Sequence, residues 1–329
     1  MEDKLAIINS GGSTNCIGGC VVVEELANNS KFEIKNPAIL MTCSGSMVAG
    51  VPYVMREYTK LEGIIKNHIA SKNSFSNFLD NFRENKSSFG KLVYNLFAKR
   101  DIISPKRIWK MIDIKMIIDI FEKEGLFSEN NLNKLFASPI DYIIPVINAE
   151  SGEIKYFSNR NRYLLRNKWE LPNVLEAAIN LPVAAKFPPF WEPTMVGGLP
   201  YFDCPLTSLA QTHIMEVVRL SEEKNLGIEK ILIVDNNNIN ASDSIFDKWF
   251  KTRDKKFKER YLENKMEIGS YLENLERILD EKGISVYTIR PNNSSLATLE
   301  DSPEVLLSLL YESRKLVDAD EKLYEFLVN

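Results

Sequence analysis

The sequence predicts an α/β fold with a mostly parallel central sheet, and three observations carry that prediction. Two strand–loop–helix units follow one another near the start of the chain, over residues 5–26 and then 37–51. A third apolar run, over residues 231–235, has the length and composition of a buried strand. Because a parallel strand pair needs a crossover, usually a helix, to return the chain, this order favours a parallel sheet covered by helices.

The other elements follow from apolar spacing and turn residues. From residue 53 to about residue 136, apolar residues recur every three or four positions, which predicts a helical insertion. Residues 140–146 and 154–157 flank a Glu-Ser-Gly-Glu turn and predict an antiparallel strand pair, so we expect a mixed sheet. Further on we expect a helix over 174–181, a long charged helical stretch over about 243–281, a strand over 286–290 and a last helix over about 303–311. Since nothing marks a linker or a repeat, we expect a single domain over 1–329.

The composition excludes several classes of protein. The chain has 329 residues, of which 44% are hydrophobic and 26% charged, as in globular proteins. Its 41 Lys and Arg against 45 Asp and Glu disfavour a dedicated nucleic-acid binder. Its apolar stretches are shorter than the ~20 residues that span a bilayer, and its acidic start lacks the basic region of a secretory signal. We therefore expect a cytosolic protein.

Ser44 is the first candidate for chemistry. It lies in Thr42-Cys43-Ser44-Gly45-Ser46, between the second apolar strand and a helix of small residues. A serine on such a sharp turn presents its hydroxyl near a helix N-terminus, which favours developing negative charge; this arrangement is a nucleophile elbow. Thr42 and Ser46 stand where the G-x-S-x-G pattern has glycine, and a helix N-cap serine is the alternative interpretation.

A glycine loop, Gly11-Gly12-Ser13, follows the first predicted strand. Backbone N–H groups in such a loop can hold an oxyanion. A tight turn is the alternative, whereas the glycine patterns of nucleotide sites are missing from the sequence. Because the loops after parallel strands emerge at the carboxyl edge of a sheet, we expect this loop and Ser44 to meet there.

Three later segments complete a recognisable pattern, over residues 138–157, 177–189 and 201–210. They match a central strand pair, an A-S-x-x-x-P segment followed by F-P-P, and a Y-x-D-G-G segment. Together with the glycine loop and the serine elbow, this pattern resembles the patatin-like phospholipases, and in particular their bacterial single-domain branch, over nearly the whole chain. The resemblance implies a three-layer α/β/α fold.

The resemblance also implies a site and an activity. Patatin-like enzymes use a Ser–Asp dyad, here Ser44 as the nucleophile and Asp203 as the base, with an oxyanion hole at Gly11, Gly12 and Ser13. The implied function is a serine acyl hydrolase that acts on carboxyl esters of lipids and needs no metal or other cofactor. An aspartate with an ordinary pKa of about 3.9 is a weak base, so we expect burial to raise the pKa of Asp203. A turn-forming aspartate is the alternative interpretation.

The chain departs from the family pattern in both loops. Ser13, Asn15 and Cys16 replace a glycine, an arginine and a glycine of the family's loop, and Asp203 is followed by Cys-Pro instead of two glycines. These departures keep two other functions open. One is a catalytically inactive patatin-like protein that binds lipid or a partner, and the other is an acyltransferase or thioesterase with the same dyad.

Several further features carry weaker expectations. Residues 248–258 interleave basic and aromatic side chains. This pattern is typical of a solvated helix face, and the alternative is a helix that contacts the inner face of the membrane. The four cysteines lie in or beside the predicted site segments, and we expect ordinary buried thiols. We expect His213 to be a core or surface histidine instead of a catalytic base. The sequence indicates no oligomeric state.

Overall fold

The computed structural model describes residues 4–12, 16–58, 60–64, 114–160, 170–180, 192–203, 210–236, 255–291 and 303–328. Its centre is an eight-stranded sheet whose hydrogen-bonded strands follow the path β5-β6-β3-β2-β1-β7-β8. β2 and β6 pair with different stretches of the long strand β3, and β4 also pairs with β3, outside that path. Five strands run parallel, namely β1 (Leu5–Asn9), β2 (Ile39–Thr42), β3 (Asp141–Asn148), β7 (Lys230–Val234) and β8 (Ser285–Ile289). β4 (Ile154–Ser158) and β6 (Leu199–Phe202) are antiparallel to β3, and β5 (Thr194–Val196) is antiparallel to β6.

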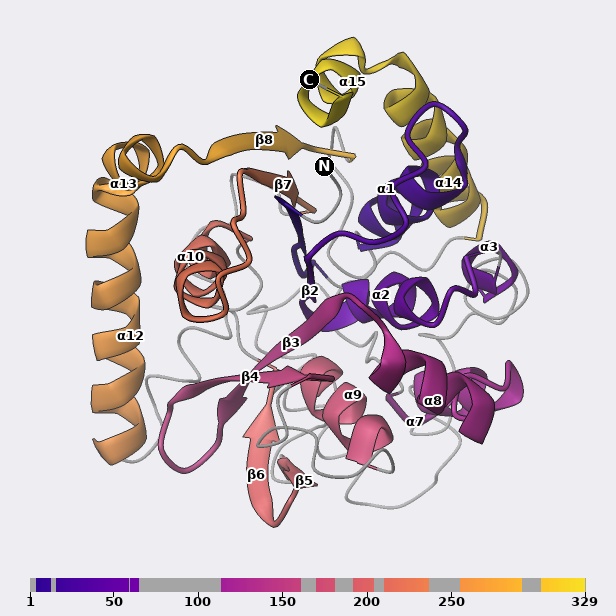
Figure 1. The fold of residues 1–329 in the computed structure, drawn as a ribbon. Helices are drawn as coiled ribbons and strands as arrows, with labels where there is room; N and C mark the ends of the chain where they lie inside the picture. Colours follow the sequence, from indigo (N-terminus) through magenta and orange to yellow (C-terminus); the bar gives the residue numbers. More distant parts are fainter. Residues whose placement is uncertain are drawn as a thin grey trace, which may run out of the picture.

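Side chains along the strands alternate between two apolar clusters, one on each face of the sheet. Ile7 and Leu40 belong to the cluster that packs against α1 (Cys16–Asn28), α2 (Met47–Val54) and α14 (Pro303–Ala319). Ile8 and Met41 belong to the cluster that packs against α10 (Ile214–Glu223) and α13 (Leu275–Lys282). Figure 1 shows these two groups of helices on opposite sides of the strands. The structure therefore confirms a mixed, mostly parallel sheet in a three-layer α/β/α arrangement.

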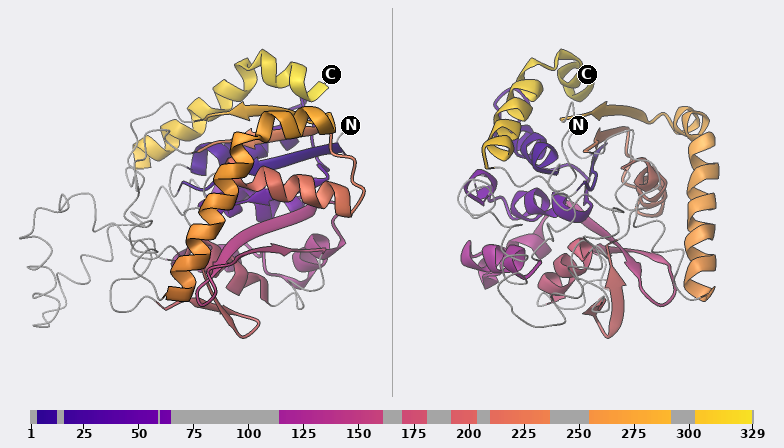
Figure 2. Two further views of the ribbon diagram at one scale, coloured as in Figure 1. Left: turned by 90° about the vertical axis from the view of Figure 1, so that its left-hand side faces the viewer. Right: turned by 180° about the vertical axis from the view of Figure 1, so that it is seen from behind.

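The remaining helices complete the two layers. The cluster that contains Ile7 also includes side chains from α3 (Lys60–Ile64), α7 (Ile114–Lys123), α8 (Glu129–Ala137), α9 (Leu171–Ile179) and α15 (Glu321–Val328). On the other side, α12 (Lys255–Glu273) lies in front of α10 in the left view of Figure 2. Phe257 and Tyr261 of α12 pack with Phe202 of β6 in a third apolar cluster.

Most elements expected from the sequence are confirmed, with ends shifted by a few residues. The helical insertion over 53–136 lies partly outside the described residues, at 65–113, and its described parts contain α3, α7 and α8. The charged stretch over 243–281 is described from residue 255 and is divided into α12 and α13 at Asn274. The single domain over 1–329 remains a prediction.

Two expectations need correction. β5 and β6 were not expected as strands, because they are three and four residues long and include or adjoin prolines at 193 and 200. The last helix continues to Ala319 instead of ending near Tyr311, and α15 follows it. Its buried stripe continues through Ser313, which is 0% exposed, to Val317, and the polar Ser313 hides the apolar period. Among the described residues, no helix is long and apolar enough to cross a membrane.

Candidate active site

Ser44 lies at the sharp turn where β2 ends and a 3-10 turn, η3 (Ser44–Ser46), leads into α2. Its φ of 53° lies in the left-handed region, which costs a residue other than glycine on the order of 1–2 kcal/mol. The N-cap residues of η3 and α2 are Cys43 and Ser46, so Ser44 caps neither helix. A strained serine between a strand and a helix is the backbone geometry of a nucleophile elbow.

The two residues that replace glycine in the elbow fit without strain. Thr42 belongs to β2, Ser46 has an ordinary helical φ of −68°, and neither has a positive φ. The Thr42 hydroxyl lies 2.8 Å from the Tyr142 hydroxyl. The Ser46 hydroxyl accepts a hydrogen bond from the Cys43 N–H at 2.8 Å. Gly50 of α2 leaves the room for this packing, because a Cβ there would lie 2.5 Å from the Thr42 methyl group.

The glycine loop leaves the sheet beside the elbow, as expected. β1 and β2 are neighbouring parallel strands in which Asn9 pairs with Thr42, so both chains turn away at the same level. The Cys43 N–H donates to the Asn9 carbonyl at 3.1 Å. Gly11 is buried, Gly12 is half-buried with a φ of 145°, and Ser13 lies outside the described residues.

Asp203 follows β6, and strand pairing places β6 on the same side of β3 as β2. Ile143 of β3 pairs with β2 and also with β4. Ile147 of β3 pairs with β4 and also with β6. Because a strand residue has one neighbour on each side, β2 and β6 both lie opposite β4. β2 runs parallel to β3 and β6 antiparallel, so the carboxyl ends of these two strands point toward each other.

The break between the two strand ends is short. Met41 of β2 pairs with Ile143, and Phe202 of β6 pairs with Ile147. One further step along each strand leads to Thr42 and Asp203, opposite the middle of β3. Ser44 turns out of the sheet two residues after Thr42, so the topology brings the candidate serine and aspartate to one gap in the sheet.

Pro145 stands on β3 opposite this gap, in a position that proline tolerates. The N–H groups of Asp141 and Ala149 donate to the carbonyls of Ala38 at 2.9 Å and Pro200 at 2.8 Å, toward the β2 and β6 side. Main-chain groups alternate between the sides of a strand, so the nitrogen of Pro145 faces the same side. Since proline has no N–H to donate, it suits a place where the ladder is interrupted.

Asp203 is buried and anchored at its backbone. It is 2% exposed, and its N–H donates to the carbonyl of Asn180 at 3.3 Å. Asn180 ends α9, and its side-chain amide donates to the Thr194 hydroxyl of β5 at 3.1 Å. The end of α9 and the β5–β6 hairpin therefore hold the backbone of Asp203 together.

Electrostatics agree with this convergence. Burial raises the pKa of the Cys43 thiol well above its usual value, and the charge of Asp203 raises it further. Burial and, to a smaller extent, the same charge raise the pKa of Cys16, at the start of α1. The charge of Asp203 therefore acts on the residue before Ser44 and on the first residue of the helix after the glycine loop. No hydrogen bond joins the described side chains of Ser44 and Asp203 in this structure, and such bonds are often long before substrate binds.

The cysteines around the site are buried thiols. Cys16, Cys20 and Cys43 are free and buried, and burial raises the pKa of Cys20 to about 12. Thiols that stay protonated near neutral pH are poor nucleophiles. Cys204 lies outside the described residues.

The basic and aromatic stretch over 248–258 is described only from residue 255, and Phe257 in it is fully buried. Among the described side chains, no group of three His, Cys, Asp or Glu forms a metal site.

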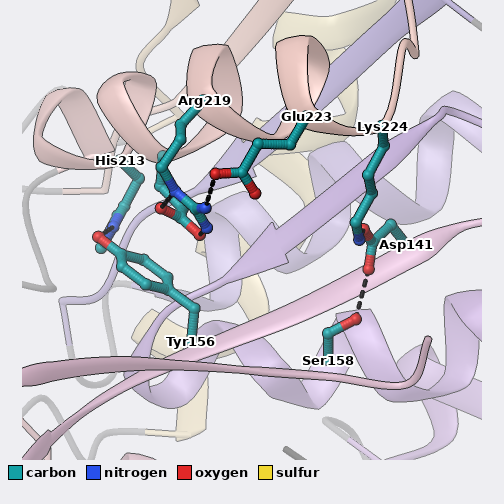
Figure 3. Close-up of polar contacts among 8 residues, drawn as sticks. Asp141, Tyr156, Ser158, His213, Arg219, Glu223 and Lys224 are labelled. Carbon is teal, nitrogen blue, oxygen red and sulfur yellow. Dashed lines mark hydrogen bonds and ion pairs between the residues drawn. The ribbon is translucent and has the colours of Figure 1, made fainter. Parts of the chain in front are cut away.

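A second polar cluster lies between β4 and α10, around a cavity of about 340 Å³ that we call the α10 groove. Its charged groups are paired with each other, as Figure 3 shows. Lys224 contacts Asp141, which also accepts a hydrogen bond from Ser158. Arg219 forms ion pairs with Glu216 and Glu223 of its own helix. His213 is fully buried and contacts the Tyr156 hydroxyl at 3.4 Å, as expected for a core histidine.

Three asparagines near the candidate site escaped the sequence analysis. Asn9 ends β1, Asn180 ends α9 and Asn236 follows β7, and each is nearly or fully buried. The sequence predicts Asn9 at the end of the first strand, Asn180 inside the helix over 174–181 and Asn236 in a loop. No sequence signal distinguishes these three asparagines, because only the structure reveals their burial.

Among solved structures, VipD from Legionella pneumophila is similar to this chain at 12% identity with a TM-score of 0.39, over 97% of this chain and 67% of VipD. No protein-family model matches the sequence, and no curated protein matches it. The likeness to VipD is too low to support a function, so the assignment depends on the residues of this chain.

Proposed function

We propose that this protein is a serine acyl hydrolase that cleaves carboxyl esters of lipids with a Ser44–Asp203 dyad. We further propose that the chain is a patatin-like enzyme and that phospholipids are its substrate class. The protein would be cytosolic and would reach its substrate at a membrane surface.

One observation supports the proposal best. A serine with a positive φ stands at the end of β2, and a buried aspartate stands at the end of β6, where the two strands point toward each other. Backbone strain at a polar residue is typical of functional sites. Burial of a carboxylate favours its protonated form, which suits a group that must accept a proton from serine.

The chemistry follows from the roles of these groups. The Ser44 hydroxyl attacks the ester carbonyl carbon while Asp203 accepts its proton, and the carbonyl oxygen becomes an oxyanion. N–H groups of Gly11, Gly12 and Ser13 stabilise that oxyanion, with the N-terminus of α2 nearby. Collapse of the tetrahedral intermediate expels the alcohol, which takes the proton from Asp203. Water then attacks the acyl-serine, Asp203 accepts its proton and returns it to Ser44, and the fatty acid leaves.

The test is hydrolysis of p-nitrophenyl esters and of phospholipid vesicles by the wild type, Ser44→Ala and Asp203→Ala. We expect Ser44→Ala to lower kcat at least about a thousandfold and Asp203→Ala at least about a hundredfold. Ser138→Ala is the matched control, because Ser138 has the same 7% exposure as Ser44 but caps the end of α8. Unchanged rates in either dyad variant would refute the assignment.

Two other outcomes correspond to the alternative functions. A wild type that hydrolyses no ester and reacts with no fluorophosphonate probe would indicate an inactive lipid-binding or partner-binding protein. Transfer of the acyl group to an added alcohol or thiol, faster than hydrolysis, would indicate an acyltransferase. Faster cleavage of thioesters than of esters would indicate a thioesterase.

A further inference from the structure

A pair of buried asparagines lies beneath the glycine loop. Asn9 and Asn236 are 0% and 1% exposed, and the Asn236 side-chain amide donates to the Asn9 side-chain oxygen at 2.8 Å. The same amide group donates to the main-chain carbonyl of Ser10 at 2.8 Å. The Asn236 backbone N–H donates to the Ser10 hydroxyl at 2.7 Å. Asn236, which follows β7, therefore holds Ser10, the first residue of the loop, at its carbonyl and at its hydroxyl.

These contacts set the direction of two peptide groups. In a planar trans peptide, the carbonyl and the N–H point in opposite directions. Because Asn236 binds the Ser10 carbonyl, the Gly11 N–H of the same peptide points away from Asn236. The Ser10 hydroxyl in turn donates to the Gly11 carbonyl at 3.2 Å, so it orients the peptide that carries the Gly12 N–H. In the described part of the chain, neither of these two N–H groups donates to a protein acceptor.

The asparagine pair is also connected to the elbow. The Asn9 carbonyl accepts hydrogen bonds from the Cys43 N–H at 3.1 Å and the Ser46 hydroxyl at 2.9 Å. Asn9 thus joins the turn that carries Ser44 to the loop that begins at Ser10. A shift of Asn236 would move the loop relative to the elbow.

Helix α1 closes over the pair through a glycine. A Cβ on Gly19 would lie 2.4 Å from the Asn236 side-chain oxygen and 2.5 Å from the Asn9 side-chain oxygen. The helix can approach this closely only because position 19 has no side chain. The amide pair is therefore enclosed, and its geometry is fixed from three sides by β1, β7 and α1.

Stability alone does not explain the pair. The Asn9 side-chain nitrogen and the Asn236 side-chain oxygen are buried and have no hydrogen-bond partner among the described residues. A buried polar group without a partner destabilises a fold, and two apolar side chains of similar shape would avoid that loss. Besides the pairing of β1 and the bond between the two side chains, the described hydrogen bonds of the pair go to Ser10 of the loop and to Cys43 and Ser46 of the elbow.

We infer that Asn236 is a positioning residue, which aims the Gly11 and Gly12 N–H groups at the oxyanion by fixing the two peptides around Ser10. This inference rests on the proposed function. Asn236 touches neither the substrate nor Ser44, and its effect passes through the loop.

The test uses Asn236→Asp, which keeps the size of the side chain but removes the N–H donor. A carboxylate there would face the Ser10 carbonyl and rotate its peptide. We expect kcat for p-nitrophenyl butyrate to fall about 100-fold with KM changed less than about threefold, because one oxyanion donor affects the transition state. The labelling rate of Ser44 by a fluorophosphonate should fall by a similar factor, since its phosphoryl oxygen occupies the oxyanion position.

Asn264→Asp is the matched control. Asn264 of α12 is 5% exposed, and its side-chain amide donates at 2.7 Å to the carbonyl of Gly152, in the connection between β3 and β4. Both variants lose an amide donor to a main-chain carbonyl, and both are assayed well below their melting temperatures. We expect Asn264→Asp to label and hydrolyse at the wild-type rate.

The outcomes separate this inference from the proposed function. If the wild type is labelled at Ser44 and Asn236→Asp reacts as fast, or Asn264→Asp slows equally, the inference alone fails. If the wild type is not labelled, the proposed function fails and the inference fails with it. Should Asn236→Asp not fold, Ser10→Ala breaks the hydroxyl contact to the Gly11 carbonyl, and an unchanged kcat in Ser10→Ala would overturn the inference, whereas a fall of about tenfold supports it.

Discussion

The two polar clusters of this molecule differ in how their groups are satisfied. In the α10 groove, Lys155, Arg219 and Lys224 are each paired with a carboxylate, and most of these side chains are partly exposed. Around Ser44, the groups are buried, one residue has a left-handed backbone, and two asparagine atoms lack partners among the described residues. The groove has more charges and a cavity of about 340 Å³, but each of these three cations has a carboxylate partner.

Paired and unpaired polar groups indicate different roles. Mutually paired charges stabilise a surface or link two elements, and they leave no group available to bind substrate. Incomplete pairing of buried groups lowers stability, so it persists where another role compensates for the loss. A left-handed backbone alone does not distinguish the two clusters, because Asn225, directly after Lys224 of the groove, has a φ of 52°. On this basis we assign activity to the carboxyl edge of the sheet and a structural role to the groove.

Replacing Ser44 should have the strongest effect of all. Both Ser44→Gly and Ser44→Ala should lower hydrolysis at least about a thousandfold, because both lack the hydroxyl. Only glycine adopts a φ of 53° without strain, so Ser44→Gly should be more stable than Ser44→Ala by about 1 kcal/mol. Urea unfolding measures this difference. Equal stabilities would show that the elbow is not strained.

In the groove, the largest expected effect is on stability. Lys224→Met removes the cation beside Asp141, whose side chain is 2% exposed, and we expect a loss of about 3 kcal/mol. The double variant Asp141→Asn/Lys224→Met should recover most of it, since no charge then remains buried. Catalytic rates of both variants should stay within about twofold of the wild type. A large fall in kcat with an intact fold would move the active site toward the groove.

A third cluster is partly buried and is paired like the groove. Arg314 of α14 donates to Glu25 at 2.8 Å and to Glu24 at 3.1 Å on α1, and to Glu62 of α3 at 2.6 Å. Burial raises the pKa of Glu24 to about 7, although the Arg314 charge acts in the opposite direction. Three carboxylates therefore share one guanidinium, and one of them is close to taking up a proton at neutral pH.

The sign of the pH effect follows from that raised pKa. Glu24 titrates at about 7 in the folded protein and at its ordinary 4.5 in the unfolded chain, so its charge destabilises the fold above pH 7. The penalty of roughly 3 kcal/mol decreases as the pH falls from 7 to 4.5. Glu24→Gln mimics the protonated acid and should exceed the wild type in stability at pH 8 by more than at pH 5. The same gap in urea unfolding at both pH values would contradict this account.

The smallest expected effect concerns an exposed ion pair. Arg219 donates from Nε to Glu216 at 2.8 Å, but its side chain is 49% exposed. Exposed pairs contribute less than about 1 kcal/mol, so Arg219→Ala should shift the free energy of unfolding by no more than that. A loss as large as that of Lys224→Met would show that burial does not distinguish the pairs in the groove.

The sequence predicted the elements whose own residues define them. Apolar runs such as 5–9 and 231–234 form buried strands because their own side chains are apolar. The small residues between Met47 and Val51, above all Gly50, allow α2 to approach the sheet closely. The order of these elements was enough to predict the shared edge of the glycine loop and the elbow. β5 and β6 could not be predicted, because their strand character depends on pairing with β3.

The candidate site was predictable only in part. Ser44 has a local signal, since a strand and a small-residue helix flank it. The prediction of Asp203 depended on the family resemblance. Asp203 approaches the elbow because β6 runs antiparallel to β3, and the chain order alone does not reveal that direction. Asn236 had no signal at all, since an asparagine after a strand is common in loops.

The most direct test of the account is the site at which a fluorophosphonate probe attaches. After reaction of the intact protein, digestion and mass spectrometry identify the modified serine. We expect the adduct on Ser44 in the wild type, with labelling slowed at least about a hundredfold in Asp203→Ala. An adduct on another serine, or labelling of Ser44 at the same rate without Asp203, would contradict the account.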